Sequence, residues 1–270
     1  MLTLEHFCVT YESAGGFFSR KKTFEAVKDV TLSLRAGETL ALVGESGSGK
    51  STLAKTLLRL TDGHVRTSGV ARIGNLDVMS AHGRALQDLH RFAQIVFQDP
   101  FSSFDPRMSV GACIAEGITA LGVLRDKDAI FERVGELLET VGLTRDAFTR
   151  LPHEFSGGQR QRVMLARALC ATHKLIILDE PVTGLDPMAM ADMYALIKKL
   201  NESGITIIMV SHDVNSAVSN ASKILHLAKN WYFYGTAHQY LHSDAGKRFI
   251  LSDCPCDECQ HRVHGGAKNV

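Results

Sequence analysis

Residues 44–52 combine glycines, a lysine and hydroxyl side chains in the order Gly-Glu-Ser-Gly-Ser-Gly-Lys-Ser-Thr. This order has the complete G-x-x-x-x-G-K-[ST] spacing of a phosphate-binding loop. The glycines allow backbone conformations that are closed to other residues, so consecutive N–H groups can converge on phosphate oxygens at the positive end of the following helix. The sequence therefore predicts a nucleoside triphosphate site made by Gly44, Glu45, Ser46, Gly47, Ser48, Gly49, Lys50, Ser51 and Thr52.

Two side chains of this loop have separate predicted roles. We expect Lys50 to reach the β- and γ-phosphates, and the Ser51 hydroxyl to complete the coordination of Mg²⁺ together with phosphate oxygens and waters. The loop follows the apolar run 39–43 and precedes the helix-like run 53–60. This order of strand, loop and helix distinguishes it from a glycine-rich turn that only connects two elements.

Two predicted strands end in side chains that suit phosphate chemistry. The apolar run 175–178 is followed by Asp179 and Glu180, and the run 205–210 by a Ser-His-Asp triplet with His212 in the middle. Ligands of open α/β sheets bind at the carboxyl ends of the strands. We expect Asp179 to hold Mg²⁺ through water, Glu180 to orient and deprotonate the attacking water, and His212 to stabilise charge on the γ-phosphate.

A second anion site is predicted at Ser156, Gly157, Gly158 and Gln159, which precede a predicted helix over 160–171. A serine and two glycines at a helix start can bind an anion through backbone N–H groups. A chain with a complete phosphate loop does not need a second one in the same pocket. The pattern therefore favours a head-to-tail dimer, in which this segment serves the nucleotide of the other subunit and two ATP molecules lie in the interface.

The apolar patterns divide the predicted strands into two kinds. Residues 2–11 and 27–34 alternate in polarity, as antiparallel edge strands do. The runs 39–43, 175–178 and 205–210 are almost unbroken β-branched and leucine residues, a pattern typical of parallel strands that are covered on both faces.

Apolar residues at helical spacing start after Asp126 and stop at Gly142, which predicts an amphipathic helix inside a mainly helical insert at about 106–151. The predicted fold class is therefore α/β, with a P-loop NTPase core of mainly parallel sheet, an antiparallel β edge subdomain and a helical insert.

Composition limits the classes of partner. Thirty basic and 29 acidic residues nearly cancel, so no long-range field favours nucleic acid or an anionic membrane as the main partner. The N-terminal residues lack the pattern of a signal peptide, and no apolar run is long enough to span a bilayer, so we expect a cytosolic chain. Cys8, Cys113 and Cys170 lie among apolar neighbours and are expected to stay reduced.

The order of the motifs resembles the ATP-binding subunits of ABC transporters over roughly residues 1–250. The motifs are the phosphate loop at 44–52, Gln98 within Val-Phe-Gln-Asp-Pro, the signature Phe-Ser-Gly-Gly-Gln at 155–159, Leu-Asp-Glu-Pro at 178–181, Gly-Leu-Asp at 184–186, and His212. The resemblance implies that residues 1–250 form one ABC ATPase domain that binds and hydrolyses MgATP.

The same resemblance implies roles for residues that spacing alone does not assign. It implies that Tyr11 stacks on adenine, that Gln98 touches Mg²⁺ and the attacking water, and that Asp186 lies at the dimer interface. It also implies that Ser156 and Gly158 contact the γ-phosphate bound by the partner, with Gln159 beside them.

Different segments of the chain resemble two different branches of this family. Residues 1–178, especially Gly-Glu-Ser-Gly at 44–47 and the segment 97–108, resemble the oligopeptide, dipeptide and nickel importer branch. Residues 181–250 resemble the ATPases of zinc and manganese importers. A natural mosaic, an engineered fusion and an intermediate lineage are all consistent with this pattern.

The resemblance implies an ATP-hydrolysing motor subunit on the cytoplasmic face of the membrane, which couples ATP hydrolysis to import through a peptide- or nickel-type permease. Its partners would be integral-membrane permease subunits and a second copy or a paralogous ATPase. A zinc or manganese permease is the alternative. A soluble ABC ATPase acting on nucleic acid or ribosomes is a different class, and the chain shows neither the heptads nor the basic excess expected for it.

The surface that receives the permease is expected beside Gln98 and on the helical insert. There Phe101, Phe104 and Met108 would supply adaptable apolar contacts for a short permease helix.

The C-terminal residues 251–270 are rich in cysteine, histidine, glycine and lysine without periodicity, and we expect a mobile tail. Its thiols and imidazoles could hold one soft metal ion such as Zn²⁺, and the candidate ligands are Cys254, Cys256, Cys259, His261 and His264. A reduced tail without metal is the alternative.

Overall fold

The computed structural model describes residues 1–12, 23–61, 64–99 and 104–250. The strands within these ranges are β1 Leu2–Glu12, β2 Thr23–Leu34, β3 Thr39–Val43, β4 Val65–Ile73, β5 Leu76–Asp77, β6 Ala93–Val96, β7 Leu175–Asp179, β8 Thr206–Val210, β9 Lys223–Leu227 and β10 Tyr232–Thr236. The α-helices are α1 Lys50–Thr56, α2 Arg84–Phe92, α3 Val110–Ala120, α4 Lys127–Thr140, α5 Gly157–Leu169, α6 Pro187–Glu202, α7 Val214–Asn220, α8 Ala237–His242 and α9 Asp244–Phe249. Two short 3-10 helices are η1 Arg145–Thr149 and η2 Pro152–Glu154.

The larger sheet has the order β10-β9-β3-β8-β7-β6 and carries the phosphate loop. Strands β9, β3, β8, β7 and β6 pair in parallel, and β10 joins β9 in the antiparallel direction. Every residue of β3, β7 and β8 is buried. Alternate residues of a strand point to opposite faces, so an unbroken apolar run indicates a strand covered on both sides.

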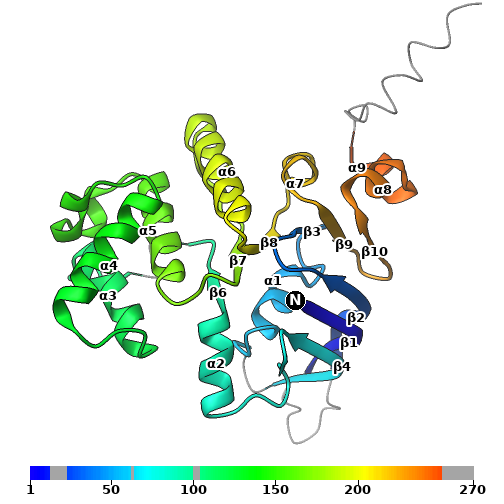
Figure 1. Cartoon of the computed structure of the whole chain (residues 1–270). Helices are drawn as coiled ribbons and strands as arrows, with labels where there is room; N and C mark the ends of the chain where they lie inside the picture. The colour runs from blue at the N-terminus through cyan, green and yellow to red at the C-terminus, as the bar shows by residue number, and fades with distance from the viewer. Residues whose placement is uncertain (13–22, 62–63, 100–103, 251–270) are drawn as a thin grey trace, which may run out of the picture.

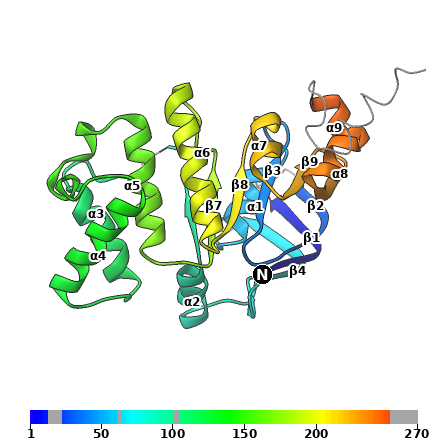
Figure 2. The ribbon, with the colours of Figure 1, turned by 45° about the horizontal axis from the view of Figure 1, so that its top comes forward.

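The two faces of this sheet belong to different cores. From β7, Ile176 and Leu178 pack with the helices α3, α4, α5 and α6, whereas Leu175 and Ile177 pack with α1 and the smaller sheet. Figures 1 and 2 show the same arrangement, with α3, α4 and α5 gathered beside the sheet and the smaller sheet on the other side.

The smaller sheet has the order β2-β1-β4-β5 and is antiparallel. Leu2 pairs with Leu34 on one side and with Ile73 on the other, and all three are buried. The alternation in β2 therefore turns one face to the core, as the period of two predicts.

The helical segment after β6 begins with well-capped helices. Ser109 accepts a hydrogen bond from the Ala112 N–H at the start of α3, and Asp126 accepts one from the Ala129 N–H at the start of α4. The apolar stripe of α4 is buried against α3 and α5, which stabilises this helical layer.

The last elements, α8 and α9, lie at the β10–β9 end of the larger sheet, away from α3 and α4 near the β6 end (Figure 1). They cover the end of β9, where Tyr240 of α8 is fully buried and its hydroxyl lies 2.7 Å from Nδ1 of His226. The predicted α/β class with a parallel core sheet, an antiparallel sheet and added helices is confirmed. Among the helices within the described ranges, none has the length and apolar character needed to cross a membrane.

Candidate functional site

The phosphate loop joins β3 to α1, and two of its glycines are required by close backbone contacts. Gly44 has a φ of 140°, and a Cβ there would lie 2.1 Å from the carbonyl oxygen of Leu227. Gly49 has a φ of 98°, and a Cβ there would lie 2.2 Å from the carbonyl oxygen of Ala26. Larger residues would clash with backbone atoms that cannot move aside, so both positions need glycine.

Lys50 is folded over this loop. Its Nζ donates hydrogen bonds to the carbonyl oxygens of Gly44, at 2.7 Å, and Glu45, at 2.8 Å. Burial lowers the pKa of this lysine, while the nearby charges of Glu180 and Asp179 act in the opposite direction. The ammonium group thus lies within the loop. There the oxygens of a bound phosphate would take the place of the two carbonyl oxygens as its partners.

Ser51 and Asp179 provide the oxygen atoms that a magnesium ion needs. The Ser51 hydroxyl donates a 3.0 Å hydrogen bond to Oδ1 of Asp179, although the two residues are 128 positions apart. Burial raises the pKa of Asp179, and the hydrogen bond from Ser51 opposes this effect. A buried carboxylate beside a hydroxyl is a hard-oxygen donor set that fits Mg²⁺.

One buried hydroxyl of the loop has no partner among the described residues. Ser48 is 6% exposed, and its Oγ makes no hydrogen bond there. Buried polar groups are almost always hydrogen-bonded, so an orphaned hydroxyl requires an explanation. This orphaned group fits a loop that is completed by a ligand.

Glu180 lies at the end of β7 in an unusual backbone conformation. Its φ is 52°, in the left-handed region that residues other than glycine rarely adopt. Its N–H donates to the carbonyl oxygen of Val210 at 3.0 Å, which ties it to β8. Backbone strain of this kind gathers at functional sites.

Two side chains hold the Glu180 carboxylate. Thr183 donates a 3.0 Å hydrogen bond from Oγ1 to Oε2 of Glu180, and Nδ1 of His212 lies 3.4 Å from the same oxygen. The Glu180 side chain is 19% exposed and that of His212 is 63% exposed. The predicted base and the predicted histidine therefore face each other where water can reach them.

Tyr11 lies beside the loop, and Gln98 follows a strand that ends at the same edge of the sheet. Gln98 follows β6, whose Val96 pairs with Leu178 directly before Asp179, so it reaches the same carboxyl edge of the sheet. The Tyr11 hydroxyl lies 3.2 Å from Oγ1 of Thr52, and the residue is 36% exposed. An accessible aromatic ring thus stands beside the phosphate loop.

Ser156 and Gln159 form a capping box at the start of α5. Ser156 Oγ accepts from the Gln159 N–H at 3.3 Å, and the Gln159 side chain accepts from the Ser156 N–H at 3.0 Å. A cavity of about 260 Å³ opens here, and its lining residues are Gly142, Leu143, Ser156, Gly158, Gln159, Arg162, Ala189 and Asp192. None of them belongs to the phosphate loop of the same chain.

Asp186 has a structural contact as well as a predicted interface role. Its side chain caps α6 by accepting hydrogen bonds from the N–H groups of Met188, at 3.0 Å, and Ala189, at 2.9 Å. Asp186 is exposed. A Cβ built on Gly158 would lie 3.2 Å from the Cβ of Ala189, so Gly158 lies close to the first turn of α6. The starts of α5 and α6 therefore share one face.

A profile of the ABC transporter family matches residues 27–183, which is more than half of the chain. The chain belongs to the ABC transporter family. Oligopeptide transport ATP-binding protein OppF of Bacillus subtilis is 42% identical over 207 residues, 74% of this chain and 65% of the relative. Dipeptide transport ATP-binding protein DppF of Lactococcus lactis is 38% identical over 213 residues, 78% of this chain and 68% of the relative.

These relatives confirm the resemblance to the oligopeptide branch. Glutathione import ATP-binding protein GsiA of Salmonella typhimurium is 43% identical over 221 residues, but the chain covers 34% of its length. The chain thus spans between about a third and two thirds of the curated relatives it matches. The resemblance of residues 181–250 to zinc and manganese importer ATPases stays a prediction.

Solved ABC cassettes share the fold. A dimeric structure of the ATP-binding cassette MJ0796 in a post-hydrolysis state, bound to ADP and Pi, matches with a TM-score of 0.73 and 27% identity. The match covers 88% of this chain and 99% of MJ0796. The whole of a single ABC cassette therefore lies within this chain.

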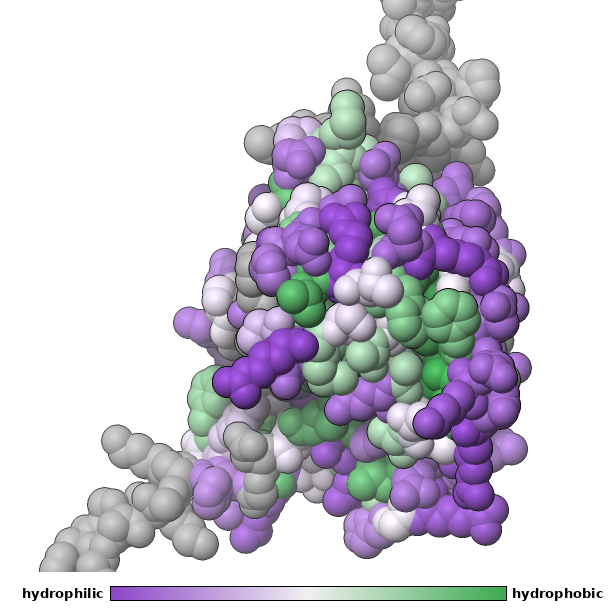
Figure 3. Space-filling model, turned by 90° about the vertical axis from the view of Figure 1, so that its left-hand side faces the viewer, coloured by the Kyte–Doolittle hydropathy of each residue, from purple (hydrophilic) through white to green (hydrophobic). Residues whose placement is uncertain are grey.

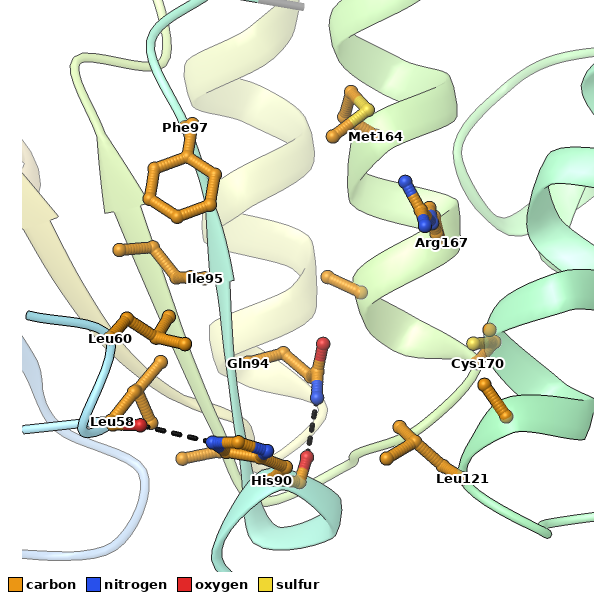
Figure 4. Close-up of a pocket in the computed structure, with 14 residues that line it drawn as sticks. Leu58, Leu60, His90, Gln94, Ile95, Phe97, Leu121, Met164, Arg167 and Cys170 are labelled. Atoms are coloured by element: carbon orange, nitrogen blue, oxygen red, sulfur yellow. Dashed lines mark hydrogen bonds between the residues drawn. The ribbon is translucent and has the colours of Figure 1, made fainter. Parts of the chain in front are cut away.

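The ABC cassette also carries a groove whose walls the sequence did not identify. It has a volume of about 450 Å³ and lies between the edge strand β6 and the helices α3 and α5 (Figure 4). Leu58, Leu60, Ile95 and Phe97 form one wall, and Met164 and Arg167 face them from α5.

At the floor of the groove, Nε2 of His90 lies 3.0 Å from the carbonyl oxygen of Leu58, and Gln94 donates a hydrogen bond to the carbonyl oxygen of His90. The lining residues come from α2, β6, α3, α5 and the turn after α1, so only tertiary packing brings them together.

The prediction that Phe104 lines the permease contact was wrong. Phe104 is 8% exposed and belongs to the core shared by α3, α4 and α5, and Met108 packs against the same core. An apolar ring next to an apolar helical layer gains more by burial than by staying accessible. Phe101 lies outside the described residues, as do the tail residues Cys254, Cys256, Cys259, His261 and His264.

Proposed function

We propose that this ABC cassette hydrolyses ATP as the motor subunit of an importer. The observation that carries the proposal is the meeting of Lys50, the Ser51–Asp179 pair and the Glu180–His212 pair at one edge of the parallel sheet. The identity to peptide and glutathione transport ATP-binding proteins supports the coupling to transport.

The side chains divide the hydrolysis step between them. Glu180 accepts a proton from a water molecule, whose oxygen forms a bond to the γ-phosphorus while the bond from that phosphorus to the bridging oxygen of ADP breaks. Lys50 and His212 stabilise the charge on the phosphate oxygens. Ser51 and Asp179 would hold Mg²⁺, with Gln98 beside it, and the ion neutralises phosphate charge when bound.

The nucleotide contacts extend over two subunits in this proposal. Tyr11 offers its exposed ring to the adenine, and the loop residues Glu45 to Thr52 bind the phosphates of one ATP. Ser156, Gly158 and Gln159 line a cavity away from the phosphate loop of their own chain, which supports their action on the nucleotide of a second copy or a paralogue. Asp186 at the neighbouring helix start would face the same interface.

The groove beside β6 is the proposed contact with the permease. Its walls are mainly apolar, and the binding of an amphipathic helix in an apolar groove is a common mode of recognition. Leu60 is 42% exposed at its rim, so it offers an apolar anchor to such a helix. This contact would place the chain on the cytoplasmic face of a membrane as a peripheral subunit.

The proposed permease is of the peptide or nickel type, because the groove and the segment around Gln98 lie within residues 1–178, which resemble that branch, and OppF and DppF are among the relatives of the chain. A zinc or manganese permease is the second candidate, since residues 181–250 resemble the ATPases of such importers.

Co-purification tests the proposal. The chain is expressed with a peptide-type permease pair and, separately, with a zinc-type permease pair. The amount of the chain that co-purifies with each pair is then measured. Leu60→Asp should abolish binding to the peptide-type pair and leave the ATPase rate of the isolated chain unchanged. Trp231→Asp, which alters an apolar residue that is 40% exposed on the turn between β9 and β10, away from the groove and the helical insert, is the matched control and should bind normally.

Binding to the zinc-type pair alone would favour the second candidate. Normal binding by Leu60→Asp would remove the groove from the contact, and absence of ATPase activity in the parent chain would refute the motor function.

A further inference from the structure

A second cavity lies beside the phosphate loop, where the turn between β9 and β10 meets β2. Figure 1 shows this hairpin next to β2, and the Thr31 N–H donates a 3.2 Å hydrogen bond to the Tyr232 hydroxyl between them. The cavity has a volume of about 390 Å³, which falls within the range of about 300–1,000 Å³ typical of small-molecule sites. Neither Lys50 nor Glu180 is among its described lining residues, so the cavity is separate from the centre proposed for hydrolysis.

The inner end of this cavity is formed by its most buried lining residues, Val27, Ser48 and Leu227, which are 1%, 6% and 3% exposed. A Cβ built on Gly44 would lie 2.9 Å from Oγ of Ser48 and 2.1 Å from the carbonyl oxygen of Leu227, so this hydroxyl lies on the β9 side of the loop. Within the described ranges, Oγ of Ser48 has no hydrogen-bond partner. Phosphate loops bind phosphates through backbone N–H groups, so the side-chain hydroxyl is left for a different ligand.

The rim of the cavity carries more positive than negative charge. Lys28 reaches from β2 to the opposite turn, where its Nζ donates a 3.5 Å hydrogen bond to Oδ1 of Asn230. Lys229 has neither a hydrogen bond nor an ion pair with any described residue. The carboxylate at the rim, Asp29, already lies 2.7 Å from Nδ1 of His6. Two ammonium groups therefore stand beside the opening, which favours an anionic ligand.

An accessible aromatic ring completes the wall. Trp231 is 40% exposed, and its ring centroid lies 5.1 Å from that of the buried His226, which holds it in place. Aromatic side chains pack well against flat apolar groups. The wall therefore suits a planar ligand.

We propose that this cavity binds a small planar organic anion. The ammonium groups of Lys28 and Lys229 bind its charged group, its flat body packs against Trp231, and a polar group at its inner end forms a hydrogen bond with Ser48. Apolar walls with a few polar groups are the usual composition of a small-molecule site. The binding of such an anion does not depend on which substrate the importer carries.

The probe is 4-hydroxybenzoate, a planar anion with a polar group at its far end, and 4-hydroxybenzamide is its neutral counterpart of similar shape. Trp231 is the only tryptophan of the chain, so its fluorescence reports on binding at the cavity without a label. The parent should bind the carboxylate at least about tenfold more tightly than the amide, the contribution of one hydrogen bond to a charged group.

The variants test each part of the cavity. Lys28→Met/Lys229→Met should bind the carboxylate and the amide equally. The matched control Lys198→Met/Lys199→Met, which removes two exposed lysines from α6, should keep the preference of the parent. Ser48→Ala should weaken binding of 4-hydroxybenzoate about fivefold through the loss of one neutral hydrogen bond.

Four results would overturn the proposal: no preference for the carboxylate in the parent, an unchanged preference in Lys28→Met/Lys229→Met, an equal loss in the α6 control, or unchanged binding by Ser48→Ala. Saturating MgADP should leave the probe bound. Full displacement by MgADP would place the probe in the nucleotide site and would also refute the assignment. Thermal melts verify that all variants are folded.

Discussion

The Glu180 carboxylate is the side chain on which the proposed chemistry depends most. It is held by Thr183 and His212 on one oxygen, and its backbone is tied to β8 by the bond to Val210. A base must lie within hydrogen-bond reach of the water that it deprotonates. Within the part of the chain that the structure describes, both side-chain contacts go to Oε2, so Oε1 can face that water.

Changing Glu180 to Gln should remove the base and keep the shape of the site. We expect ATP affinity to be preserved and turnover to fall by about 10²–10⁴-fold, the usual contribution of a general base. The variant should accumulate as an ATP-bound dimer, seen as a shift in size-exclusion chromatography upon ATP addition. Turnover like that of the parent would exclude Glu180 from the role of base.

Thr183 should act as a positioning residue for Glu180. Thr183→Val removes the 3.0 Å hydrogen bond to the carboxylate without a large change in volume, and Thr183→Ser keeps the hydroxyl. We expect kcat of the valine variant to fall about tenfold, the cost of one hydrogen bond to a charged group, with the KM for ATP unchanged. The serine variant should restore kcat. Equal kcat in the valine and serine variants would contradict this role.

At the scale of elements, the position of α8 depends on a histidine buried under it. His226 of β9 contacts the rings of Tyr240, Trp231 and Phe249 and is 1% exposed. Burial lowers the pKa of His226 to about 4, and the Lys50 charge adds to this effect. In the folded chain this imidazole is therefore neutral at pH 7, and its Nδ1 is joined to the Tyr240 hydroxyl.

This burial predicts a pH dependence of stability. Between pH 6.5 and about 4 the unfolded chain binds a proton at His226 that the folded chain does not, so the free energy of unfolding should decrease as the pH falls through this range. His226→Gln should reduce this slope, measured by urea unfolding at several pH values. His153→Gln, at an exposed position, should leave it unchanged. Identical slopes for His226→Gln and the parent would contradict the prediction.

At the scale of the whole molecule, the proposed ATP site would be shared between two copies. The phosphate loop and Glu180 are gathered at one edge of the sheet, whereas Ser156 and Gly158 line a separate cavity at the start of α5. The dimeric MJ0796 cassette has the same fold, with a TM-score of 0.73.

The space-filling view from the side of α3 and α4 shows apolar surface near the centre of that face, within a hydrophilic rim (Figure 3).

A mixture of two inactive variants should therefore recover activity. A Ser156→Arg chain retains its phosphate loop, and a Lys50→Ala chain retains its signature segment, so a mixed dimer has one intact composite site. We expect each variant alone to be inactive and the mixture to hydrolyse ATP, with a rate that rises more steeply than linearly with protein concentration. A linear dependence without recovery would indicate catalysis by a monomer.

The sequence alone determined the elements and the chemistry of the loop. Continuous apolar runs at 39–43, 175–178 and 205–210 predicted parallel strands, and the structure buries all three on both faces. The helix predicted after Asp126 begins at Lys127 with that aspartate as its cap. These features are local, because backbone sterics, side-chain period and capping act over a few residues.

Only the tertiary structure decided which side chains meet. It brought Ser51 to Asp179 across 128 positions, set Thr183 and His212 on one oxygen of Glu180, and gathered the groove from separate elements. It also placed Phe104 in the core, against the prediction of an accessible contact. Composition shows that a residue is apolar, but its burial depends on the volume left between packed helices, which no local pattern contains.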